Sequence, residues 1–106
     1  MPQTRQTPHY DLLRVAKLVK NGHYVLTAKV ENDINSYGYT LTAVGEALLN
    51  INNTHFSKSM ESERRPGEWL DVYSLPFDDD IFYIKFKISS EPAVVVLSFK
   101  PDGAVR

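Results

Sequence analysis

Four strand-like segments follow one another in the second half of this chain, and only short links separate them. The segments cover residues 54–61, 68–75, 80–89 and 93–100. The links contain RRPG, PFDDD and SSEP, whose Pro, Gly and Asp residues are typical of turns. Strands joined by short links pair most simply with their sequence neighbours, so these segments predict an antiparallel meander.

The third segment, DIFYIKFKIS at 80–89, has the clearest alternation of side chains. One face of this strand would carry Phe82, Ile84, Phe86 and Ile88. The opposite face would carry Tyr83, Lys85 and Lys87. The first set predicts a core face. The second set combines a phenol with two ammonium groups and no acid, so this face is either simply solvated or a binding site for an anion.

The first half of the chain begins with a helical pattern. Thr7 is a suitable N-cap and Pro8 suits the first helical position. Asn21-Gly22 is a typical helix end. Residues 24–27 then form a short strand candidate.

Two further helices are predicted before the strands begin. One covers residues 28–37 and stops at Gly38, and the other covers 40–50, where Gly45 weakens the pattern. Helices followed by strands favour an α+β fold, in which the helices pack on one face of the antiparallel sheet. A chain of 106 residues suits one domain, taken here as residues 1–106.

The composition limits the classes of protein to consider. The chain has no Cys, which excludes disulfides and zinc–thiolate sites. Its 12 Lys and Arg against 13 Asp and Glu give a net charge of −1, less basic than a general nucleic-acid coating protein. Any site for a polyanion must therefore be local. The start, MPQTRQTPHYDLL, lacks the apolar stretch of a signal peptide, and no apolar run approaches the about 20 residues that span a bilayer. We expect a cytoplasmic protein without a membrane partner.

Metal binding is not predicted. His9, His23 and His55 lie at spacings that match no metal motif. The acidic run 78–80 lacks the spaced ligands of a calcium loop and is expected to be a solvated turn. The sequence also contains no Gly-rich phosphate loop. We therefore expect no metal and no cofactor.

Basic and phenolic residues of the predicted sheet are the remaining candidates for chemistry. They are Lys58, Tyr83, Lys85 and Lys100. Together they would suit a phosphodiester, because ammonium groups offset the charge of the transition state and a phenol can donate a proton. RNA supplies its own nucleophile, the 2′-OH, and needs neither a covalent residue nor a metal.

Five segments resemble the MqsR family of toxins from bacterial type II toxin–antitoxin systems, which have a RelE-like ribonuclease fold. They are TPHYDLLRVAKLVKNG near the start, FSKSM (56–60), WLDVY (69–73), FYIKF (82–86) and VLSFK (96–100). The segments occur in the family's order and at similar intervals, over roughly residues 7 to 100. The predicted order of helices and strands agrees with that fold.

The resemblance implies a metal-independent endoribonuclease, an mRNA interferase. It would cut messenger RNA at GCU-like triplets and be inhibited by a cognate antitoxin, through which alone it would contact DNA. The family's catalytic residues fall on Lys58, Tyr83 and Lys100. Lys85 and Lys87 would bind the substrate.

One family position differs and leaves alternatives open. The family has a glutamine where this chain has Leu70. Leu70 either faces the RNA, where a hydrogen bond is lost, or lies with Val72 on the core side of its strand. Lys58 or Lys100 could act as the base. Alternatively, both lysines stay charged and only stabilise negative charge, and Tyr83 transfers the protons. The alternative function is a non-catalytic binding module for protein or RNA with the same fold.

Overall fold

The computed structural model describes residues 3–102, which form one mixed sheet and three helices. The helices are α1 (Leu12–Lys20), α2 (Ala28–Tyr37) and α3 (Leu41–Asn50), followed by a 3₁₀ turn, η1 (Asn53–His55). The strands are β1 (Thr4–Arg5), β2 (Tyr24–Leu26), β3 (Phe56–Glu61), β4 (Trp69–Phe77), β5 (Asp80–Ile88) and β6 (Val94–Pro101). The predicted α+β class is confirmed.

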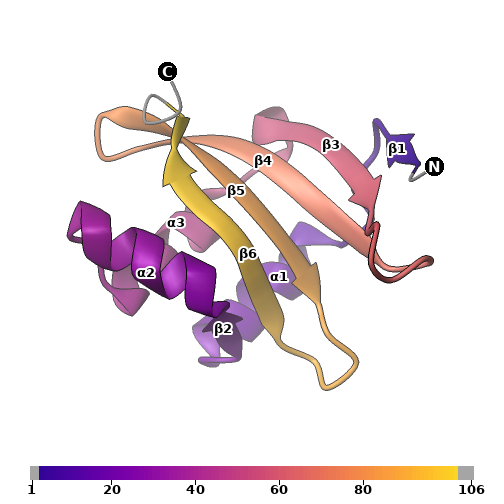
Figure 1. Ribbon diagram of the computed structural model, residues 1–106, viewed down its shortest axis with the longest axis horizontal. Coiled ribbons are helices and arrows are strands. Elements are labelled where there is room, and N and C mark those ends of the chain that lie inside the picture. Colours follow the sequence, from indigo (N-terminus) through magenta and orange to yellow (C-terminus); the bar gives the residue numbers. More distant parts are fainter. Residues whose placement is uncertain (1–2, 103–106) are drawn as a thin grey trace.

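The six strands lie in the order β1-β3-β4-β5-β6-β2. Strands β3 to β6 are the predicted antiparallel meander. The sequence indicated β2 as a short strand candidate, but not its parallel pairing with β6. It did not indicate β1, which pairs antiparallel with β3. Figure 1 shows α1 and α3 behind the sheet and α2 beside β6. Among residues 3–102, no helix has the length and apolar character to cross a membrane.

The core lies between the sheet and the helices. Phe82, Ile84 and Phe86 of β5 are completely buried there, which confirms the predicted core face of this strand. Tyr73 of β4 stacks on Phe86, with ring centroids 5.6 Å apart. The opposite face, which α1 and α3 leave uncovered, carries Lys85 and its neighbours and is called the open face below.

Helix α2 has the predicted bounds because its ends have strong local signals, and α3 begins one residue later than predicted, with Thr40 as its N-cap. The Thr27 hydroxyl accepts a hydrogen bond from the Val30 backbone N–H at 3.3 Å, and Gly38 closes α2 with φ 81°. Gly45 lies inside α3 because a β-carbon there would overlap the Tyr24 hydroxyl. The glycine therefore serves close packing of α3 on β2.

The predicted start of the first helix at Thr7 is wrong, because α1 begins at Leu12 with Asp11 as its N-cap. The preceding backbone is held by the sheet instead. The buried Asp71 carboxylate accepts hydrogen bonds from the backbone N–H groups of His9 and Tyr10, at 2.9–3.1 Å. These N–H groups are thus bound to a residue about 60 positions away, and the helix starts only after them.

The turn between β4 and β5 is shorter than the predicted PFDDD link. Phe77 pairs with Asp80, so only Asp78 and Asp79 form the turn, with φ 51° and 62°. Both central residues have positive φ, as a tight two-residue hairpin of the type I′ class requires. The Tyr39 hydroxyl donates a hydrogen bond to the Asp78 carboxylate at 2.6 Å, which holds one of these acids in place.

Candidate active site

A row of paired residues crosses the open face. Lys58 of β3 pairs with Val72 of β4, Val72 pairs with Lys85 of β5, and Lys85 pairs with Ser98 of β6. Directly paired residues share one face of a sheet. Because neighbouring strands lie about 4.8 Å apart, the α-carbons of the two lysines are about 10 Å apart. Their long side chains can therefore approach one bound polyanion.

The next row adds the other two predicted catalytic residues. Tyr83 of β5 pairs with Lys100 of β6, two residues from the Lys85–Ser98 pair. A pocket of about 450 Å³ opens here, and its lining residues are Lys29, Tyr83, Lys85, Ser98, Lys100 and Asp102. The structure thus brings Tyr83, Lys85 and Lys100 together in the pocket. Lys58 lies in the row of Lys85, outside the pocket.

Sequence reasoning missed Lys29, Ser98 and Asp102 as pocket residues. Ser98 lies two residues before Lys100, so the strand period offered a signal for it. Lys29 belongs to the first turn of α2, and only the packing of this helix beside β6 brings it to the site. No local pattern in the sequence indicates that placement.

Lys85 has the most perturbed ammonium group of the site. Partial burial lowers its pKa, and the nearby positive charges of Lys29, Lys100 and Lys58 lower it further. Both effects disfavour the charged form. A larger fraction of Lys85 is therefore neutral near pH 7 than for an ordinary lysine, which makes it a better proton acceptor.

Tyr83 has the opposite tendency. Its pKa is raised by partial burial, since desolvation disfavours the phenolate. The hydroxyl therefore keeps its proton at neutral pH and is available as a donor. The pocket thus places a proton donor and a proton acceptor two residues apart on one strand face.

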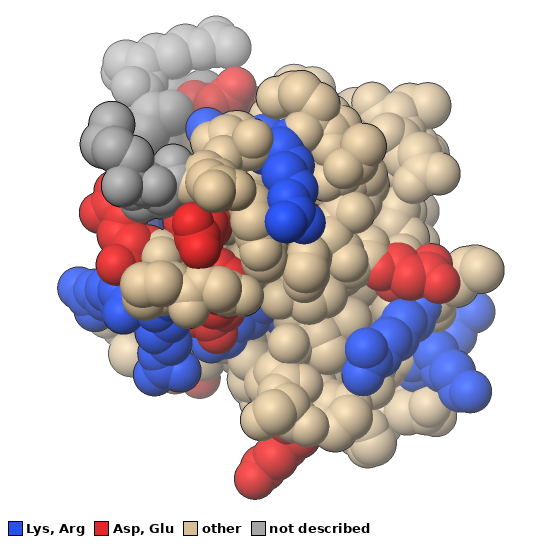
Figure 2. Space-filling view, turned by 90° about the vertical axis from the view of Figure 1, so that its right-hand side faces the viewer, with Lys and Arg blue, Asp and Glu red and all other residues tan. Residues whose placement is uncertain are grey.

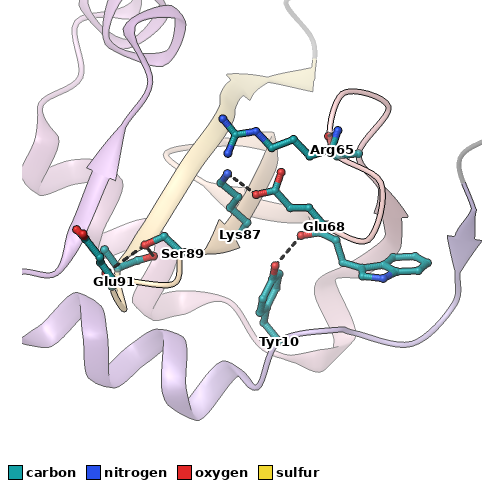
Figure 3. A network of polar contacts seen from close by, with 9 residues as sticks. Tyr10, Arg65, Glu68, Lys87, Ser89 and Glu91 are labelled. Atoms are coloured by element: carbon teal, nitrogen blue, oxygen red, sulfur yellow. Dashed lines mark hydrogen bonds and ion pairs between the residues drawn. The ribbon is translucent and has the colours of Figure 1, made fainter.

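Lys87 is in a different environment from the other lysines. Its ammonium forms an ion pair with Glu68, and its side chain is only 15% exposed. Figure 3 shows this pair beside Arg65, which lies on the turn before β4. The predicted substrate-binding role of Lys87 stays untested, but its charge is balanced within the protein and it does not line the pocket.

Leu70 lies on the open face. Tyr73 and Leu75 form the core side of β4, whereas Leu70 pairs with Met60 and lies on the same face as Val72, two residues further along the strand. The interpretation that placed Leu70 on the core side is therefore wrong. Its side chain is nevertheless only 7% exposed. A polar group at this position would face the same side of the sheet as Lys85.

If this site cleaves RNA, as the sequence resemblance implies, Leu70→Gln is expected to raise the cleavage rate or sharpen the triplet preference by about ten- to two-hundredfold, because the amide supplies both a donor and an acceptor. Turnover on a panel of RNA triplets and the melting temperature of the variant should be measured together. Leu13→Gln, the same substitution at an exposed position of α1, is the matched control. A lower melting temperature without any gain in rate or selectivity would contradict the prediction.

His9 and His55 make structural contacts. His9 stacks on Trp69, with ring centroids 5.9 Å apart. His55 Nδ1 accepts a hydrogen bond from the Asn52 backbone N–H at 3.1 Å and completes the cap of η1. Within the described range, 3–102, no three His, Asp or Glu side chains gather as a set of metal ligands.

Two other hollows formed by residues 3–102 have different linings: one is lined by the acidic turn 78–80, and the other is uncharged apart from Asp11 and His9. The latter hollow, of about 790 Å³, lies between the start of α1 and the end of α3, and its lining has no Lys or Arg. Figure 2, which faces the side of β1 and β3, shows basic and acidic side chains next to each other at both margins of a broad, mostly uncharged area. We therefore assign the candidate active site to the lysine-lined pocket.

Comparison with known proteins shows the family of this chain. Residues 7–101 match the family described as "Motility quorum-sensing regulator, toxin of MqsA". A relative in Escherichia coli (strain K12), the mRNA interferase toxin MqsR, is 26% identical over 96 residues, which are 91% of this chain and 96% of the relative. The match extends from the segment before α1 to the end of β6. The chain therefore belongs to the MqsR toxin family.

Proposed function

We propose that this protein is an mRNA interferase, a toxin that acts as a metal-independent endoribonuclease on messenger RNA. The proposal is supported by membership of the MqsR toxin family and by the name of the relative, mRNA interferase toxin. The observation that carries it is the pocket in which a protonated phenol and three lysines surround one space. That combination suits a phosphodiester and its negatively charged transition state.

The proposed reaction is an internal transfer within the RNA. The 2′-oxygen attacks the adjacent phosphorus and forms a new P–O bond, while the bond from phosphorus to the 5′-oxygen breaks. The 2′-OH loses its proton, and the leaving 5′-oxygen takes one up. The products are a 2′,3′-cyclic phosphate and a 5′-hydroxyl, with no redox change and no co-reactant.

Each step has a candidate residue in the pocket. Neutral Lys85 accepts the proton of the 2′-OH, which its lowered pKa favours. Tyr83 donates a proton to the leaving oxygen, which its raised pKa favours. Lys58 and Lys100 offset the charge that develops on the phosphoryl oxygens. This division of roles explains why several lysines are gathered around one tyrosine.

The proposal extends to regulation and specificity. We infer that a cognate antitoxin binds this protein and inhibits it, as the family description, toxin of MqsA, suggests. GCU-like triplets are the expected cleavage sites, with a preference altered by Leu70. Contact with DNA would be made only through the antitoxin.

RNA cleavage in saturating EDTA tests the proposed function. A labelled single-stranded RNA should yield shorter products with 2′,3′-cyclic phosphate ends, at a rate that added magnesium does not change. The same oligonucleotide with a 2′-deoxy residue at the cleavage position is the control and should stay intact. If EDTA abolishes cleavage and magnesium restores it, the metal-independent mechanism is wrong. RNA binding without any cleavage would favour the non-catalytic binding module.

A further inference from the structure

Lys29 is held beside the pocket by the way α2 begins. The Thr27 backbone N–H donates a hydrogen bond to the Val96 carbonyl of β6 at 3.2 Å, and Thr27 is also the N-cap of α2. The start of the helix is thus fixed to the strand that carries Ser98 and Lys100. Two residues after this anchor, Lys29 lines the same pocket as both of them.

The Lys29 ammonium has a partner that an anion can replace. It lies 3.1 Å from the Asp33 carboxylate, four residues along α2, and the Lys29 side chain is 61% exposed. An exposed ion pair of this kind is weak because water screens it. A bound phosphate can therefore take the place of Asp33 at small cost.

We infer that Lys29 is an additional RNA-binding residue of this site, which contacts a phosphate next to the scissile one on the β6 side. Asp33 holds its ammonium in position until the RNA binds. The inference rests on the proposed function, because it takes RNA as the polyanion. It extends the positive path across the sheet, from Lys58 on β3 through Lys85 on β5 to helix α2.

Lys29 also influences the proton acceptor. The titratable side chains that surround Lys85 come from its own strand, β3, β6 with the residue after it, and α2: Tyr83, Lys58, Lys100, Asp102 and Lys29. Removing the positive charge of Lys29 raises the pKa of Lys85, because one repulsive neighbour is lost. The rate then needs a higher pH to reach its plateau.

Binding of an uncleavable single-stranded RNA, with 2′-O-methyl groups throughout, tests the inference without depending on catalysis. Lys29→Ala should reduce the slope of log affinity against log salt by about 0.7. Between 1 M and 50 mM salt, the affinity of the variant should therefore rise about eightfold less than that of the wild type. Lys20→Ala, an exposed lysine on α1 behind the sheet, removes the same charge and should change the slope much less.

The Lys29–Asp33 ion pair allows a second test, in which RNA binding should become stronger. Asp33→Asn should strengthen binding, because it frees the Lys29 ammonium, and Glu46→Gln on α3 is the control for the lost negative charge. In cleavage assays, Lys29→Ala should raise KM and shift the acidic limb of the pH–rate profile to higher pH. A purely structural role for Lys29 would move neither the salt slope nor this limb.

The possible outcomes separate the two proposals. If Lys29→Ala binds RNA as Lys20→Ala does, the inference about Lys29 is overturned while the ribonuclease proposal stands. If the wild type binds RNA but never cleaves it, the proposed function fails, and the salt slope still decides the role of Lys29. A wild-type protein that binds no RNA overturns both.

Discussion

Lys58→Ala should lower the rate of RNA cleavage by about 10² to 10³, the usual effect of removing one group that stabilises charge in a transition state. Lys58 stands in the row with Lys85 but outside the pocket. Its loss would remove a positive charge near the phosphoryl oxygens. It would also raise the pKa of Lys85 and so reduce the neutral, proton-accepting fraction.

Single-turnover cleavage rates over a range of pH should be compared for the wild type and Lys58→Ala. Lys17→Ala, on the exposed side of α1, is the control for a lost charge. Lys58→Arg keeps the charge and should recover part of the rate. The melting temperature should change little, since a partly exposed lysine contributes little to the core. A folded Lys58→Ala protein with the wild-type rate would remove this residue from the mechanism.

Asp71→Ala should lower the free energy of unfolding by about 2–5 kcal/mol, because the His9 and Tyr10 N–H groups both lose their acceptor. Asp71 is completely buried, so water cannot easily replace the carboxylate. A domain of this size has about 5–15 kcal/mol of stability in total. The variant should therefore be among the least stable single substitutions on β4.

Urea denaturation of Asp71→Ala measures this loss directly. Asp71→Asn retains one acceptor oxygen and should lose less stability. Ser74→Ala, at an exposed position of the same strand, is the control and should change stability by less than about 0.5 kcal/mol. A change of that small size in Asp71→Ala would show that the segment before α1 is not held by this carboxylate.

The same carboxylate explains why the start of α1 could not be chosen from the sequence. Thr7 and Pro8 are good local signals for a helix start, and so is Asp11, which is the N-cap in the structure. The competing acceptor, Asp71, comes from the middle of the sheet and reaches the backbone only after β4 has formed. By contrast, Thr27 and Gly38 act within a few residues, so the bounds of α2 followed from the sequence.

In the site, too, local sequence patterns predicted some positions, whereas others depend on contacts between distant residues. Strand alternation placed Tyr83 and Lys85 on one face, and the register of β6 adds Lys100 beside them. Alternation also placed Lys87 on this face, where its own strand has no acid, but Glu68, the residue before β4, balances its charge. The pairing register of the strands decides which acid lies beside which lysine. A single sequence does not define that register.

The position of β6 determines when activity can first arise during synthesis. This strand is made after every other helix and strand described here, yet it lies inside the sheet between β5 and β2. A nascent chain that ends before Val94 lacks both Lys100 and the parallel neighbour of β2, so Lys29 has no β6 to lie against. The proposed activity is therefore expected to require the complete β6, because a nascent chain without this strand lacks Lys100 and the β6 side of the pocket.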